Sequence, residues 1–114
     1  AHSFVKPSPS ATMRAPRALL LGDMGEVGTR GPEFHAEVGA YANERGIEQL
    51  WCAGALCAHA ASAFDAGARH FADALSMVSS IGELPQVASL LVKGSRFMQM
   101  ERVVQAIQEQ KKND

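Results

Sequence analysis

The stretch ALLLGDMGEVG, residues 18–28, decides the expected fold, because a short apolar run ends directly in a glycine-rich loop. An uninterrupted apolar run bounded by Gly22 is typical of a strand buried on both faces of a sheet. The loop spaces its glycines as G-x-x-G-x-x-G, which is neither the dinucleotide-binding nor the phosphate-binding glycine pattern. Such glycines equally suit a loop that only needs positive backbone torsions. Its acidic residues, Asp23 and Glu26, suit an ammonium group, a metal-bound water or an arginine better than a phosphate.

Helix and strand patterns alternate after this loop. Pro32 and Glu33 suit the first turn of a helix that reaches Arg45, with Gly46 as its cap. The further elements that the pattern predicts are a strand over 47–53, a helix over 55–64, a short strand over 69–71, a helix after Asp73 that presents Leu75, Val78 and Ile81, a strand over 87–92, and a final helix marked by Phe97, Met100, Val103, Val104 and Ile107. This alternation predicts an α/β fold, a mostly parallel sheet with helices on both faces.

Composition limits the class of protein. The chain has 114 residues, 46% of them hydrophobic, and a formal charge of -1, which argues against disorder and offers no basic field for nucleic acid or anionic lipid. No apolar run approaches the ~18–20 residues of a membrane span, and no signal-peptide pattern opens the chain. We therefore expect a cytoplasmic domain over residues 17–110. Residues 1–16 read as a linker, an irregular lead-in or a vector-derived remnant, and residues 111–114 as a polar tail.

A second loop, Lys93-Gly94-Ser95-Arg96, follows the last predicted strand. Parallel sheets bind ligands beyond the carboxyl ends of their strands, so this loop and the first are the expected site. Ser95 is predicted to cap the final helix, and Arg96 to lie at its positive end, where a carboxylate or phosphate is favoured. The alternative is an ordinary helix cap with a surface ion pair.

The remaining chemistry-bearing residues point to packing. Cys52, Cys57 and His59 lack a familiar zinc spacing, so we expect buried thiols and no metal site. His35 is expected to be exposed or to cap a helix, with a position facing the site as the alternative. Trp51, Met98 and Met100 are expected in the core. No catalytic constellation or phosphate-binding loop is present.

Five segments carry a family resemblance: LLLGDMGEVG at 19–28, HAEVGAYA at 35–42, GI at 46–47, HFAD at 70–73 and LVKGSR…MERVV at 91–104. Together they resemble the C-terminal domain of the Mur ligases that add D-alanyl-D-alanine to UDP-N-acetylmuramoyl-tripeptide in bacterial peptidoglycan synthesis, over about residues 17 to 108. The resemblance implies a Rossmann-like fold and a three-domain cytoplasmic enzyme serving cell wall biogenesis, cell shape and cell division. It implies that ATP and Mg²⁺ bind mainly to a central domain absent from this chain, over which the C-terminal domain closes.

The resemblance also implies roles for the two loops. Arg96, with Lys93 and Ser95 nearby, would face the dipeptide carboxylate or a nucleotide phosphate, while Asp23 and Glu26 would orient the amine end or hold the closed interface. The full expected substrate-binding set is Asp23, Met24, Glu26, His35, Lys93, Gly94, Ser95 and Arg96, with no catalytic residue in this chain.

One departure from the family limits this transfer. The family segment D-S-Y-N-A-N-P-x-S-M, which meets the adenine nucleotide, is replaced here by residues 3–14 without its asparagines. No adenine-contacting residue is therefore carried over, and the chain is expected to be inactive by itself. The competing readings are a free-standing α/β interaction or regulatory module and a flavodoxin-like nucleotide binder.

Overall fold

A parallel four-stranded sheet forms the middle layer of the computed structural model, which describes residues 14–25, 28–65 and 67–112. Its strand order is β3-β2-β1-β4. The strands are β1 (Arg17–Gly22), β2 (Gln49–Ala53), β3 (Arg69–Phe71) and β4 (Ser89–Lys93). The register pairs Leu20 of β1 with Trp51 of β2 and with Val92 of β4. The predicted parallel sheet is confirmed, and each predicted strand end agrees with the structure to within two residues.

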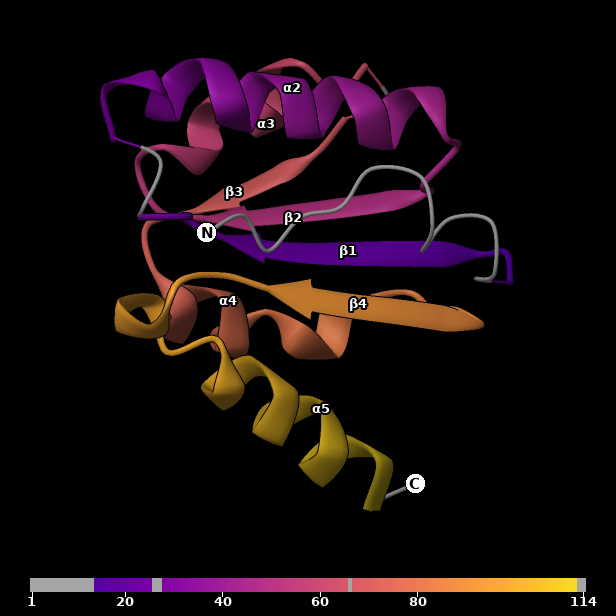
Figure 1. Cartoon of the computed structure of the whole chain (residues 1–114). Coiled ribbons are helices and arrows are strands. Elements are labelled where there is room, and N and C mark those ends of the chain that lie inside the picture. The colour runs from indigo at the N-terminus through magenta and orange to yellow at the C-terminus, as the bar shows by residue number, and fades with distance from the viewer. Residues whose placement is uncertain (1–13, 26–27, 66, 113–114) are drawn as a thin grey trace.

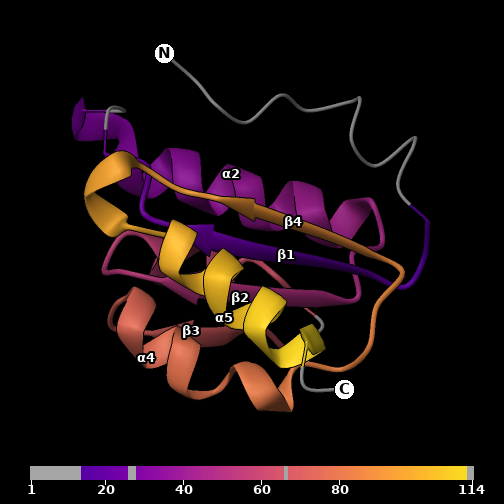
Figure 2. The same cartoon turned by 90° about the horizontal axis from the view of Figure 1, so that it is seen from below.

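Helices cover both faces of this sheet, as expected (Figure 1). The helices α2 (Gly31–Glu44) and α3 (Cys57–Ser62) lie on one face, and α4 (Ala74–Ser79) and α5 (Glu101–Lys112) lie on the other (Figures 1 and 2). Three short 3-10 turns complete the described elements: η1 (Gly28–Arg30), η2 (Ile81–Glu83) and η3 (Arg96–Met98). None of the helices in the described ranges is long and apolar enough to cross a bilayer.

The core divides into two clusters, one on each face of the sheet. Leu19 and Leu21 pack into the cluster beneath α2 and α3, while Ala18 and Leu20 join the cluster beneath α4 and α5. All four side chains are at most 2% exposed. The burial of alternate residues on opposite faces explains why this strand reads as an unbroken apolar run.

Element ends follow the predicted capping chemistry in two places. Gly46 has φ +76 directly after α2, a conformation that favours glycine. The Asp73 carboxylate accepts a hydrogen bond from the Ser76 amide at 2.9 Å, which caps α4 as expected.

Two predictions about the helices on the second face are wrong. Leu75 is 57% exposed, because the short helix α4 turns Ala74 and Met77 toward the sheet instead. The final helix begins at Glu101, since Gln99 adopts a left-handed conformation with φ 55 that separates η3 from α5. Phe97 therefore lies in η3, and its side chain is 66% exposed instead of packed in the core.

Candidate functional site

The loops that leave β1 and β4 lie together at one edge of the sheet (Figure 1). β1 has β2 on one side and β4 on the other, and the chain turns from β1 to α2 but from β4 to α5 on the opposite face. Such a reversal of winding is the topological switch point of a parallel sheet, where the loops diverge and leave a crevice for ligands. The two loops singled out in the sequence meet at this point.

Ser95 ties the two loops together. Its amide donates to the Asp23 carbonyl at 3.0 Å, its hydroxyl donates to the same carbonyl at 2.7 Å, and the Gly25 amide donates to its Oγ. The prediction that Ser95 caps the final helix is wrong, because its hydroxyl is engaged in this tie and η3 separates it from α5. Arg96 accordingly lies in η3 and not at the positive end of α5.

Glycines allow the ends of β1 and β4 to approach each other closely. A Cβ atom on Gly94 would lie 3.2 Å from the Gly22 Cα and 2.7 Å from the Met100 Cγ. A Cβ on Gly22 would likewise lie 2.8 Å from the Met100 Cγ and Sδ. The role of Gly94 in the structure is thus to let the second loop pass over the first strand, with Met100 packed against both glycines.

The buried carboxylate of Asp23 caps the N-terminus of α3. Its side chain accepts hydrogen bonds from the Leu56 amide at 3.1 Å and from the Cys57 amide at 2.8 Å, at the beginning of α3. The residue is 8% exposed. A carboxylate at a helix N-terminus satisfies amides that have no partner within the helix, so Asp23 anchors the first loop to α3.

His35 anchors the same loop to α2. Its Nδ1 donates to the Gly31 carbonyl at 2.7 Å, which leaves the lone pair of Nε2 to accept from the Met24 amide at 3.0 Å. The expectation that His35 is exposed is wrong, because the ring is completely buried. The Met24 side chain, 7% exposed, packs in the core cluster beneath α2 and α3.

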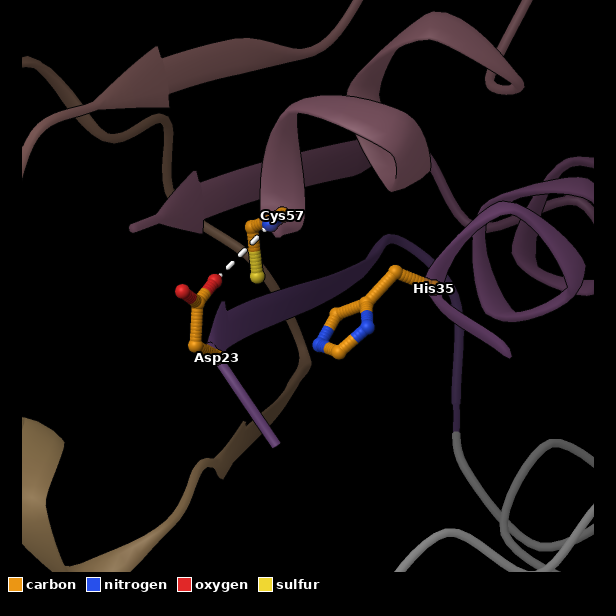
Figure 3. Close-up of side chains that lie close together, drawn as sticks. All are labelled: Asp23, His35 and Cys57. Carbon is orange, nitrogen blue, oxygen red and sulfur yellow. Dashed lines mark hydrogen bonds between the residues drawn. The ribbon is translucent and has the colours of Figure 1, made fainter. Parts of the chain in front are cut away.

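Asp23, His35 and Cys57 form a cluster whose potential metal-binding atoms lie within 4.8 Å of one another (Figure 3). Each side chain already has a protein partner, and the Cys57 thiol donates to the Leu21 carbonyl at 3.5 Å. A hydrogen bond with Cys52 and burial raise the pKa of the Cys57 thiol far above its ordinary value. Through these hydrogen bonds the three side chains link the first loop and the end of β1 to α2 and α3. Both cysteines are buried and free, as predicted.

A shallow cavity of about 400 Å³ opens between the end of β4 and the first turn of α5. Lys93, Arg96 and Glu101 supply charged groups to its lining. The remaining lining residues are Val92, Gly94, Ser95, Met100 and Val104. Among the residues that the structure describes, none of the three charged side chains takes part in an ion pair.

Glu101 was missed in the sequence, although it stands in the segment MERVV that carries the resemblance. Glu101 follows Arg96 by five residues, which is the one signal that it could share a site with Arg96. In the continuous final helix that the sequence predicts, residues five apart point in different directions, so this signal was not usable. Glu26, a predicted site residue, lies outside the described residues.

Comparison with known proteins finds relatives of this chain. No family model matches the chain. The chain is 38% identical over 102 residues to the UDP-N-acetylmuramoyl-tripeptide–D-alanyl-D-alanine ligase of Escherichia coli strain K12, an alignment covering 87% of this chain and 22% of the relative. The ligase of the same name from Buchnera aphidicola is 30% identical over 100 residues, covering 84% of this chain and 22% of the relative. The chain is homologous to the Mur ligases.

A solved structure has a similar fold. The MurF crystal structure from Acinetobacter baumannii matches with a TM-score of 0.67 over 82% of this chain and 22% of that one, at 24% sequence identity. This likeness confirms the α/β fold, and the homologues confirm the family that the motifs indicated. This chain spans only about 22% of the length of the two ligases that it matches.

Proposed function

We propose that this chain is the acceptor-binding, closing domain of an ATP-dependent amide ligase that joins D-alanyl-D-alanine to UDP-N-acetylmuramoyl-tripeptide in peptidoglycan synthesis. The activity is the one that both homologous ligases are named for. In this reaction the tripeptide carboxylate takes the γ-phosphoryl group of ATP, which leaves as ADP. The dipeptide amine then attacks the acyl carbon, phosphate departs, and the nitrogen loses its proton as the amide forms.

The observation that carries this proposal is the pair of cations at the switch point, neither of which forms an ion pair with another described residue. Lys93 ends β4 and Arg96 begins η3, and both line the cavity there. A guanidinium binds a carboxylate or phosphate through two parallel hydrogen bonds, which also fixes the orientation of the ligand. Arg96, assisted by Lys93, therefore faces the dipeptide carboxylate or a nucleotide phosphate, while both hydrogen-bond donors of Ser95 stay on the Asp23 carbonyl.

The buried members of the expected set act through the backbone in this proposal. Asp23 and His35 use their side chains to hold the first loop against α3 and α2, so they position that loop. Met24 fixes it from the core side. This leaves Glu26 as the acidic residue of that loop for the closed domain interface.

Nucleotide and metal chemistry belong to another part of the ligase in this proposal. The Asp23, His35 and Cys57 cluster is the one group of three metal-ligating side chains in the described ranges, and its donors are already satisfied. A hard cation such as Mg²⁺ prefers oxygen ligands and retained waters, which this buried, thiol-containing cluster does not offer. ATP and Mg²⁺ are accordingly assigned to a central domain. The family resemblance also implies that the enzyme acts in the cytoplasm.

Steady-state kinetics of the full-length ligase that contains this domain test the proposal. The unmodified enzyme should form the UDP-linked pentapeptide only when D-alanyl-D-alanine is supplied. Arg96→Ala should raise the KM for the dipeptide or for ATP by about threefold to tenfold, the value of a partly solvated charged hydrogen bond. Arg102→Ala is the matched control, because Arg102 bonds Gln99 on the exposed side of α5. Unchanged KM values for both substrates in Arg96→Ala would remove Arg96 from the site.

A further inference from the structure

The ammonium group of a dipeptide acceptor needs an anionic contact that is free to make it. Asp23 lies at the switch point, but its side chain accepts from two backbone amides, and it is buried. Turning this carboxylate toward a ligand would leave the amides that begin α3 without partners, at a cost of about 1–3 kcal/mol for each buried donor. Asp23 is therefore poorly suited to bind the amine.

Glu101 is a lining residue of the cavity that meets this requirement. It is exposed, it occupies the first turn of α5, and it lines the same cavity as Lys93 and Arg96. Ion pairs do form elsewhere in the described part of the chain, as between Arg69 and Glu83 at 2.8 Å. Lys93, Arg96 and Glu101 line one cavity but form no ion pair with one another.

The uncharged lining matches the rest of the ligand. Val92, Met100 and Val104 supply apolar surface to the cavity. D-Alanyl-D-alanine carries an ammonium group at one end, a carboxylate at the other, and two methyl side chains between them. A cavity lined by two cations, one carboxylate and apolar side chains offers a group for each part of this molecule.

From this arrangement we infer that Glu101 binds the ammonium end of the acceptor dipeptide, while Arg96 and Lys93 bind its carboxylate. The inference rests on the proposed function and identifies the residue on which recognition of the free amine depends. Glu101 orients the ammonium group in the ground state. The nitrogen releases one proton to solvent before it attacks the acyl carbon, and a second proton as the amide forms. Glu101 is thus a specificity residue, with selectivity for acceptors that carry both charges.

The first test compares Glu101→Gln with Glu109→Gln in the full-length ligase. Both remove one exposed carboxylate from α5, but Glu109 lies outside the cavity. We expect Glu101→Gln to raise the KM for D-alanyl-D-alanine by about threefold to tenfold, with the KM values for ATP and the tripeptide unchanged. Glu109→Gln should match the unmodified enzyme. An unchanged dipeptide KM in Glu101→Gln, or an equal rise for ATP, would overturn the inference.

The second test removes the charge from the ligand instead. N-Acetyl-D-alanyl-D-alanine lacks the ammonium group and serves as an inhibitor competing with the dipeptide. Glu101→Gln should raise the KM for the dipeptide relative to the unmodified enzyme. The inhibition constant of the acetylated compound should be the same in both enzymes. Equal changes for both compounds would show that Glu101 acts through structure and would overturn the inference. An unmodified ligase that makes no product from D-alanyl-D-alanine would refute the proposed function itself, whereas normal ligation with no effect of Glu101→Gln would refute only the role of Glu101.

Discussion

At the scale of single residues, the first loop is held by buried polar groups that each satisfy a specific backbone partner. Asp23 bonds the amides that start α3, and His35 bonds the Met24 amide of the loop. Neither contact is visible in the sequence, because Asp23 and Leu56 are 33 residues apart and only the completed sheet brings them together. The sequence indicated that Asp23 mattered, but it could not separate a ligand-binding carboxylate from a helix-capping one.

Gly54 tests this arrangement most sharply. It has φ +109, and a Cβ atom there would lie 2.4–2.6 Å from the carboxylate atoms of Asp23. Gly54→Ala should lower the free energy of unfolding by about 3–5 kcal/mol, since it combines backbone strain, overlap and loss of the α3 cap. Urea denaturation followed by circular dichroism measures the change.

Gly67→Ala is the matched control for this substitution. Gly67 also has positive φ, at +88, but a Cβ atom there would meet nothing within 4 Å. It should cost only the backbone strain, about 1–2 kcal/mol. Equal losses for the two variants would mean that the contact with Asp23 is unimportant.

At the scale of elements, α2 and α3 pack so closely that one glycine decides their distance. A Cβ atom on Gly39 would lie 2.1 Å from the Ala60 carbonyl oxygen. In an exposed helix, replacing glycine by alanine stabilises by about 1 kcal/mol. Here Gly39→Ala should instead destabilise by about 2–3 kcal/mol, because the helices must move apart. Ala40→Gly, at the exposed neighbouring position, should cost about 1 kcal/mol, and a stabilised Gly39→Ala variant would contradict the packing described here.

The N-terminus of α4 should give the fold a distinct acid dependence. The Ser76 amide lowers the pKa of the Asp73 carboxyl below its ordinary value of 3.8. A lowered folded-state pKa means that this contribution to stability is present above the unfolded value and is lost as pH falls through the folded one. Urea midpoints of unmodified protein and Asp73→Asn should therefore differ at neutral pH and converge at low pH.

Asp65→Asn controls for the general loss of negative charge, since Asp65 is an exposed acidic residue in the turn after α3. Its midpoint should follow that of the unmodified protein into acid. A constant difference between Asp73→Asn and the unmodified protein at every pH would show that the ionised carboxylate adds nothing to the cap.

Most elements were predictable because local periodicity and capping chemistry agree with their final packing. The unbroken apolar run of β1, the Asp73 cap and even the short strand Arg69–Phe71 were found in this way. The start of α5 was not, because Gln99 takes a left-handed conformation that its residue type does not signal. This one break moves Phe97 from the core to the surface and brings Glu101 to the cavity rim.

At the scale of the whole molecule, the order β3-β2-β1-β4 places the switch point between the two loops that carry the charge. The sequence predicted these loops from their position after strands, as the parallel topology requires. It could not predict the cavity, which depends on how η3 and α5 are set against β4. The strand order thus determines where the site lies, and the break between η3 and α5 at Gln99 determines its shape.

The shallow cavity also predicts how this chain behaves by itself. Ligand sites with high affinity enclose about 70–90% of a small ligand, whereas this cavity lies open at the surface. We expect D-alanyl-D-alanine to bind the isolated chain with a Kd of about 1 mM or weaker, and ATP to be neither bound tightly nor hydrolysed. Titration of amide resonances should show shifts between residues 93 and 101, with matched additions of sodium chloride as the control for ionic strength. Saturable ATP binding at micromolar concentration would contradict the assignment of nucleotide binding to another domain, and dipeptide shifts confined to other elements would contradict the location of the acceptor cavity.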